Sequence, residues 1–301
     1  MFGSLAATPG SEPKQRQVLL QRAGPVRNTQ RSPSSSAVAA VLFDLDNTLL
    51  LEDESTALAL REACAAIAGR TGIDVDVMVV AAREAADDLF RRSAVFTYAD
   101  AIGVWWGEVL WGEFVGETAG LAALRAFVPD FRRRVWSRAL SAAGVADEGL
   151  VEKAIRAFVS ARRRTQLVDP DAEAVVRDLA RDHRLALVTN GAPDVQREKL
   201  SHTSLAAWFA VSIISGEIGI GKPDPRIFEA ALTELGVAPQ NAVMVGDSPT
   251  RDVAGAHAAG LRVIWIDRGS NEAAPSSRPT PDARVTRLGE VRAALAAVTS
   301  R

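Results

Sequence analysis

Five short apolar runs restrict the fold of this chain more than any other feature of its sequence. The runs are Val38–Leu45, Leu185–Thr189, Val211–Ile214, Ala242–Val245 and Val263–Ile266. Runs of this length suit strands that are buried on both faces, as in a parallel sheet. Helical patterns bounded by Gly, Pro or Asn lie among the later runs, at Pro193–Leu200, Arg226–Leu235 and Arg251–Ala259. This alternation predicts βαβ units, and hence an α/β fold with a doubly wound, Rossmann-like parallel sheet.

The segment between the first and second runs has no strand pattern. From Asp53 to Val168, Ala, Arg, Glu and Leu recur at helical spacing. Apolar stripes run along Ser55–Arg70, Val75–Arg92, Tyr98–Gly107, Pro129–Ala143 and Glu148–Arg164. We expect these helices to form a small bundle, inserted after the first strand as a second domain. The predicted division is therefore a core at residues 37–52 and 169–301 and an all-helical cap at residues 53–168.

Residues 1–36 differ in charge from the rest of the chain. They contain five Lys or Arg residues and one Glu, a net charge of +4, whereas the remainder carries −6. Because this stretch lacks periodic apolar residues, it predicts a disordered basic tail. It has no apolar core of a secretory signal, and a transit peptide, a nucleic-acid-binding arm and a dispensable extension remain alternative interpretations. The acidic remainder disfavours a nucleic-acid-binding body, since affinity for duplexes rests mainly on Lys and Arg.

The composition of the sequence indicates a compartment and limits the kinds of partner that the protein can have. The single cysteine, Cys64, excludes an intramolecular disulfide and a Cys-based zinc site, which favours a reducing compartment, the cytoplasm. The apolar stretches of the sequence are far shorter than the roughly 20 residues that a membrane-spanning helix needs. The tract Gly269–Pro281 predicts a loop before a last amphipathic helix at Leu288–Val298. We expect neither membrane nor nucleic-acid partners, and the oligomeric state stays open.

The first apolar run ends in a cluster of acidic residues, within the segment FDLDNTLL (Phe43–Leu50). At the carboxyl end of a central parallel strand, such residues lie in the crevice where open α/β sheets bind ligands. The period of two along a strand directs Asp44 and Asp46 to broadly the same side, so both carboxylates can reach one substrate. The alternative is that Asp46 and Asn47 only form a turn that Asp44 caps.

Later strand ends carry polar groups that suit the same chemistry. Thr189 and Asn190 follow the second run, where a hydroxyl and backbone amides can hold a phosphoryl oxygen. Lys222, in GIGKPDP, supplies a cation, and the carboxylates of Asp247 and Asp252, in VGDSPTRD, suit Mg²⁺. Each group alone has a structural explanation as a turn, a solvated cation or a helix cap. Their occurrence in order favours a site for phosphoryl transfer.

These segments resemble the four ordered motifs of the haloacid dehalogenase superfamily, which match FDLDNT, VTNG, GKPDP and VGDSPTRD here. The resemblance covers Val38 to Asp267. The helical insertion resembles the cap of the superfamily's C1 phosphatases, and TNG, QREKL and GKPDPRIF are similar to N-acylneuraminate 9-phosphatases, phosphoglycolate phosphatases and pyrimidine 5′-nucleotidases. The resemblance implies a Mg²⁺-dependent phosphatase that hydrolyses a small-molecule phosphate monoester.

The resemblance also implies a role for each matching residue. Asp44 attacks phosphorus and forms an aspartyl-phosphate, and Asp46 protonates the leaving oxygen and then activates water. Lys222 orients Asp44 and contacts the transferred group. The implied substrate-binding residues are Thr48, Thr189, Asn190 and Lys222, and the implied Mg²⁺ ligands are Asp44, the backbone carbonyl of Asp46, Asp247 and Asp252.

Asp46 separates two reactions within this resemblance. The dehalogenases of the superfamily have a tyrosine at this position, because a departing halide needs no proton whereas an alcohol does. Asp46 therefore favours hydrolysis of a phosphate ester. A phosphomutase and a noncatalytic binding protein with the same fold remain alternatives, and no motif in the predicted cap specifies the substrate.

Two weaker features have structural interpretations. The predicted cap holds four of the six tryptophans, and aromatic residues at helical spacing are expected in its core. The arginine runs Arg132–Arg134 and Arg162–Arg164 are expected on solvated helix faces, with contact to a second acidic group of the substrate as the alternative.

Overall fold

The structure, a computed structural model, describes residues 38–269 and 280–299. Within these residues six strands form one parallel sheet in the order β3-β2-β1-β4-β5-β6. The strands are β1 (Ala40–Phe43), β2 (Arg184–Thr189), β3 (Val211–Ile214), β4 (Ala242–Gly246), β5 (Arg262–Ile266) and β6 (Ala283–Val285). The first five correspond to the five apolar runs, so the predicted fold class is confirmed. The predicted tail at residues 1–36 and most of the tract Gly269–Pro281 lie outside the described residues.

β1 lies at the centre of the sheet, between β2 and β4. Phe43, the last residue of β1, is level with Leu187 of β2 and Val245 of β4. Later strands add on both sides of β1, so the segments that follow β1, β2 and β4 meet at one edge of the sheet. Open α/β sheets bind their ligands at such a switch point.

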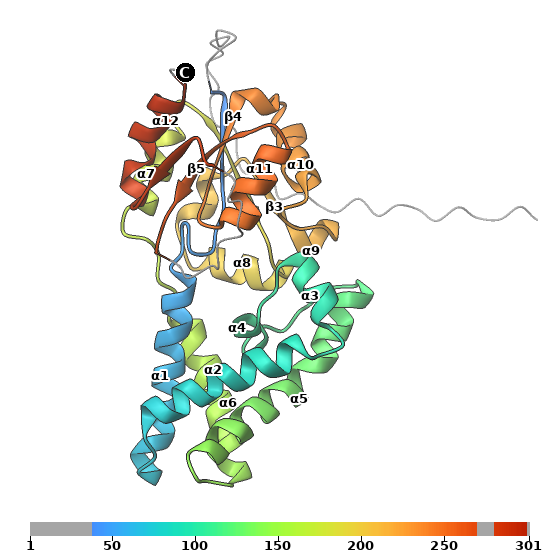
Figure 1. Cartoon of the computed structure of the whole chain (residues 1–301), viewed down its shortest axis with the longest axis vertical. Helices are drawn as coiled ribbons and strands as arrows, with labels where there is room; N and C mark the ends of the chain where they lie inside the picture. Colours follow the sequence, from blue (N-terminus) through green and yellow to red (C-terminus); the bar gives the residue numbers. More distant parts are fainter. Residues whose placement is uncertain (1–37, 270–279, 300–301) are drawn as a thin grey trace, which may run out of the picture. The chain divides into compact units, whose positions relative to one another are not determined.

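Helices cover both faces of the sheet (Figure 1). The helices of this part of the chain are α7 (Ala172–Leu179), α8 (Pro193–Ser201), α9 (Ser215–Ile218), α10 (Pro225–Leu235), α11 (Ala254–Ala258) and α12 (Val291–Thr299). α7 and α12 pack with Val41 and Phe43 of β1, whereas α10 and α11 pack with Ala40 and Leu42. Successive side chains of a strand point to opposite faces, and both faces of this sheet are covered. The strands therefore appear in the sequence as continuous apolar runs.

Seven helices lie between β1 and β2 in the described chain, and the first six of them form a group apart from α7. These six are α1 (Glu52–Thr71), α2 (Val75–Arg91), α3 (Phe96–Ile102), α4 (Trp106–Val109), α5 (Ala119–Ala142) and α6 (Glu148–Arg164), and we call them the inserted helices. Their shared core buries Trp111, Phe131, Trp136 and Phe158, which confirms the core interpretation for these aromatic side chains. All described residues fall in one compact unit, and the boundaries of the predicted core and cap stay a prediction.

Two of the inserted helices differ from their predicted bounds. The predicted helix Tyr98–Gly107 is interrupted, because Gly103 adopts a left-handed φ of 77° that ends α3. The predicted helix Pro129–Ala143 begins ten residues earlier, where the side chain of Thr118 caps α5. Pro129 lies inside α5, so it removes one helical hydrogen bond without ending the helix.

Smaller differences concern the later part of the chain. The predicted helix Arg251–Ala259 starts as a π-helical turn at Pro249–Val253 and continues as α11. Short 3₁₀ helices occur at Leu205–Trp208, Pro239–Asn241 and Leu288–Glu290. β6 was not predicted, since its three residues form no apolar run. Within the described residues, no helix combines the length and apolarity that crossing a membrane requires.

Candidate active site

Asp44 follows β1 directly and is paired with Lys222. Nζ of Lys222 donates to Oδ1 of Asp44 over 2.5 Å and to Oδ1 of Asp252 over 2.7 Å. All three side chains are buried. Asp252 also accepts a hydrogen bond at Oδ2 from the backbone N–H of Ser248, over 3.0 Å. The fold thus brings together three of the candidate residues from segments far apart in the sequence.

Thr48 and Asp247 lie beside this group. The hydroxyl of Thr48 is 3.4 Å from Oδ2 of Asp44 and 3.4 Å from Oδ1 of Asp247. Asp44, Asp247 and Asp252 each offer a carboxylate oxygen, and these oxygens lie within 4.8 Å of one another. Carboxylate oxygens grouped in this way suit a hard divalent cation such as Mg²⁺. These three aspartates form a candidate metal site in the described part of the chain.

Burial governs the charge of this group. The pKa of Asp44 is raised to about 7, because burial and the charge of Asp252 raise it more than Lys222 lowers it. Burial alone would lower the pKa of Lys222, but the attraction of Asp252 and Asp44 outweighs it and raises that pKa above its ordinary value. The side chain of Lys222 therefore stays protonated and positively charged at this site. Further positive charge would favour the ionised form of Asp44.

The carboxylate of Asp46 has a different set of partners. Nζ of Lys199 donates to its two oxygens, over 3.0 and 2.9 Å, and Nε2 of Gln196 donates to Oδ2 over 3.1 Å. Gln196 and Lys199 stand three residues apart in α8, so they share one face of that helix. The side chain of Asp46 keeps 23% of its surface exposed. It is thus held on one side and accessible on the other.

A buried ionic network continues from Lys199 into the inserted helices. Glu108 of α4 accepts at Oε1 from Lys199 and from Gln196, each over 2.8 Å. Glu52 of α1 lies 3.4 Å from Nζ of Lys199 and accepts from Arg162 of α6 over 2.5 Å. Burial raises the pKa of Glu108 to about 7, although Lys199 lowers it. None of Gln196, Lys199, Glu108 and Glu52 was among the predicted site residues.

Thr189 and Asn190 follow β2 and contact different neighbours. The hydroxyl of Thr189 lies 3.4 Å from Oε1 of Gln196. The side chain of Asn190 donates to the backbone carbonyl of Lys222 over 3.0 Å and accepts from its N–H over 2.8 Å. Asn190 therefore holds the backbone of Lys222 in place, and its contact with substrate stays a prediction.

Arg268 holds the loop that follows β1. Its Nε donates to the carbonyl of Asn47 and its Nη2 to the carbonyl of Thr48, each over 2.8 Å. Nη2 also lies 2.7 Å from Oδ2 of Asp169. Asn47 has a φ of 56°, in the left-handed region, so the chain turns sharply directly after Asp46. Arg268 was not predicted, and it stands just beyond the segment that carries the motifs.

The part of the sequence that carries these aspartates and this lysine matches a known family. A model of haloacid dehalogenase-like hydrolases matches residues 38–260, which include Asp44, Lys222, Asp247 and Asp252. The chain belongs to this family. The resemblance predicted from the motifs is therefore confirmed.

Curated relatives of this hydrolase include phosphatases. Phosphoserine phosphatase of Thermus thermophilus is 45% identical over 252 residues, which are 83% of this chain and 96% of that protein. Human N-acylneuraminate-9-phosphatase is 32% identical over 174 residues, 57% of this chain and 70% of that protein. The magnesium-bound structure of the HAD hydrolase YfnB from Bacillus subtilis is 20% identical, covers 86% of this chain and 99% of its own, and has the same fold with a TM-score of 0.59. The chain thus stands with the phosphatases of the family.

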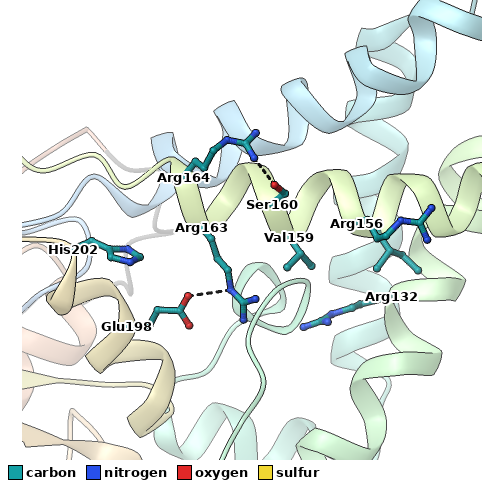
Figure 2. Close-up of a pocket in the computed structure, with 9 residues that line it drawn as sticks. Arg132, Arg156, Val159, Ser160, Arg163, Arg164, Glu198 and His202 are labelled. Carbon is teal, nitrogen blue, oxygen red and sulfur yellow. Dashed lines mark hydrogen bonds and ion pairs between the residues drawn. The ribbon is translucent and has the colours of Figure 1, made fainter.

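A basic pocket of this hydrolase is lined by residues of α5, α6 and α8, and three of its arginines, Arg132, Arg163 and Arg164, are already paired. Figure 2 shows Arg163 directed toward Glu198, 3.0 Å away, and Arg164 directed toward Ser160. Arg162, in the same run, is buried against Glu52. The expected solvated arginine face is therefore wrong for Arg162, whose pairing with Glu52 compensates its burial.

Proposed function

We propose that this chain is a Mg²⁺-dependent phosphatase that hydrolyses a small-molecule phosphate monoester through an aspartyl-phosphate on Asp44. The observation that carries the proposal is the convergence of Asp44, Lys222, Asp247 and Asp252 at one edge of the sheet. An anionic nucleophile that approaches an anionic phosphate needs positive charge at the reacting centre. Lys222 supplies one such charge, and the three carboxylates suit a metal ion that supplies another.

The donor set fits Mg²⁺. Asp44 and Asp247, with the backbone carbonyl of Asp46, are the proposed ligands, and Asp252 completes the acidic group while it also accepts from Lys222. When bound, Mg²⁺ supplies electrostatic stabilisation of the transferring phosphoryl group and favours the ionised form of Asp44.

Two proton transfers are assigned to Asp46. In the first step a carboxylate oxygen of Asp44 attacks phosphorus, the bond to the ester oxygen breaks, and Asp46 donates its proton to that oxygen. In the second step Asp46 takes a proton from water as the water oxygen attacks phosphorus, and phosphate leaves Asp44. The hydroxyls of Thr48 and Thr189 and the ammonium of Lys222 are the proposed contacts of the phosphoryl oxygens.

O-Phospho-L-serine is the substrate that we propose first, because the phosphoserine phosphatase of Thermus thermophilus aligns with most of this chain. Its leaving group is an aliphatic alcohol, which departs poorly without a proton, and Asp46 suits that requirement. A cytoplasmic location stays a prediction.

A substrate panel tests this proposal. We expect the purified full-length protein to release phosphate from phosphoserine, or from another panel member such as phosphoglycolate, N-acetylneuraminate 9-phosphate or a nucleoside monophosphate. Release should require Mg²⁺, stop in EDTA and vanish in Asp44→Asn. Activity retained in Asp44→Asn would overturn the mechanism. An isomerised product without net phosphate release would identify a phosphomutase instead.

A further inference from the structure

Two buried side chains outside the four motifs contact Asp46, and both also contact a third buried side chain, that of Glu108. Gln196 and Lys199 donate to the carboxylate of Asp46, and both also donate to Oε1 of Glu108. Each of the three is only 1% exposed. We call Glu108, Gln196 and Lys199 the support cluster.

The donor hydrogens of the support cluster are almost fully used, whereas Oε2 of Glu108 is buried without a hydrogen-bond partner. The amide of Gln196 has two donor hydrogens, and carboxylates of Asp46 and Glu108 lie 3.1 and 2.8 Å from its nitrogen. The ammonium of Lys199 has three, and three carboxylates, those of Asp46, Glu108 and Glu52, lie within 3.4 Å of it. Rotation of Asp46 out of its present orientation would leave buried donors without an acceptor, which is costly.

The backbone beside the support cluster leaves room for Gln196. Gly191 has a φ of 138°, and a Cβ at this position would collide with the side-chain amide of Gln196. A glycine is therefore required on two grounds, its conformation and the close approach of the amide. The hydroxyl of Thr189 lies 3.4 Å from Oε1 of Gln196, which ties the orientation of the Gln196 amide to the end of β2.

Glu108 links this arrangement to the inserted helices. It comes from α4, 88 positions before Gln196, and contributes the acceptor that both donors share. Without Glu108, Gln196 and Lys199 would each have one fewer fixed partner and more freedom to move away from Asp46. Asp46 is thus supported by side chains from two distant segments of the chain.

We infer that Glu108, Gln196 and Lys199 are positioning residues, which hold the side chain of Asp46 where its carboxyl group, when protonated, can give a proton to the leaving oxygen. The inference rests on the proposed role of Asp46 in hydrolysis. A general acid acts only within hydrogen-bond reach of the group it protonates, and misplacement by about 1 Å can cost on the order of 100-fold in rate. Helix α4 is then part of the machinery that protonates the leaving group.

The dependence of the rate on the leaving group tests this inference. Phosphoserine, or the aliphatic ester that the wild type hydrolyses fastest, needs a proton on its leaving oxygen. An aryl ester such as p-nitrophenyl phosphate has a leaving group that departs as an anion. kcat/KM reports steps up to formation of the aspartyl-phosphate, so it isolates the first proton transfer from the second.

Gln196→Met is the most informative variant, because it preserves the size and charge of the side chain while it removes both amide hydrogen bonds. We expect kcat/KM for the aliphatic ester to fall about 10- to 100-fold, and that for the aryl ester to fall less than about threefold.

Asp46→Asn should show the same selectivity with a larger loss. Glu108→Gln should show it more weakly, because the amide keeps the volume but loses the charge. Lys199→Arg should recover part of the activity that Lys199→Met loses.

Arg61→Gln is the matched control, since Arg61 is an exposed side chain of α1 that pairs with Asp76. It should change neither substrate's rate. Circular dichroism and thermal unfolding of each variant establish that it is folded.

Three outcomes would overturn the inference: equal losses on both esters, no loss on either, or a faster rate on the aliphatic ester. Equal losses indicate a structural role, and a faster rate indicates that the support cluster withholds Asp46. These outcomes are separate from a failure of the proposed function. That failure would appear as absent phosphate release in the wild type, or as activity retained in Asp44→Asn.

Discussion

Lys222 and Asp44 are 178 positions apart, yet Nζ of Lys222 lies 2.5 Å from Oδ1 of Asp44 in a buried pair. Removal of one partner from a buried ion pair leaves the other uncompensated, which typically costs about 3–5 kcal/mol. We expect Lys222→Met to lower the free energy of unfolding by about this amount in EDTA, as measured by urea denaturation. Added Mg²⁺ should reduce the difference in unfolding free energy between Lys222→Met and the wild type, because it brings positive charge back to the same carboxylates.

Lys153→Met is the control for Lys222→Met. Lys153 donates from an exposed position to the carbonyl of Ala66, so its loss should change the unfolding free energy by less than about 1 kcal/mol. If Lys222→Met proved as stable as the wild type in EDTA, the pair would not have the electrostatic role assigned to it.

The acidic group predicts stabilisation by Mg²⁺. A ligand that binds only the folded state adds about 2.7 kcal/mol at a concentration 100 times its Kd, so Mg²⁺ should raise the melting temperature. Asp247→Asn removes one charged oxygen ligand and should weaken Mg²⁺ binding at least about tenfold in calorimetric titration. Asp130→Asn, an exposed aspartate of α5, should leave the affinity unchanged. Equal affinities in all three proteins would place Mg²⁺ elsewhere.

The sheet could be predicted because the burial of each strand is visible in its own few residues. A parallel strand covered on both faces must be apolar at every position, and this requirement produced the continuous runs at β1 to β5. The edge strand β6 has little buried surface and therefore no comparable signal. The start of α5 was missed for another reason: Pro129 resembles a helix start, whereas the Thr118 cap lies upstream of it.

Only the site residues that belong to one of the four motifs could be predicted from the sequence. Gln196 and Lys199 had a usable signal, a polar pair at helical spacing directly after the turn at Gly191. Glu108 had none, since its neighbours in WWGEVLW are apolar and only tertiary contacts explain its burial. Arg268 likewise acts on backbone carbonyls some 220 positions away, a relation that composition and periodicity do not encode.

Stability should depend on pH through Glu108. Its pKa in the folded protein is about 7, above the ordinary 4.5, so between these values the folded state holds a proton that the unfolded state has lost. This contribution is complete below about pH 4.5 and is lost as the pH rises through about 7. Glu108→Gln removes the titration, so its metal-free unfolding free energy should fall less steeply than that of the wild type between pH 5 and pH 8. Urea denaturation across this range measures both curves, and parallel curves would contradict the prediction.

The loop between Asp46 and α1 should lose its fixed shape without Arg268. The guanidinium binds two consecutive carbonyls, of Asn47 and Thr48, and pairs with buried Asp169. Arg268→Met should speed amide hydrogen exchange at residues 47–51 and lower kcat about tenfold, because Asp44 and Asp46 lie directly before the loosened turn. Arg268→Lys keeps the charge but not the fork that reaches both carbonyls, so it should restore only the pairing with Asp169. Arg181→Gln, at an exposed arginine, is the control and should alter neither exchange nor turnover. Unchanged exchange in Arg268→Met would show that the left-handed turn at Asn47 holds the loop by itself.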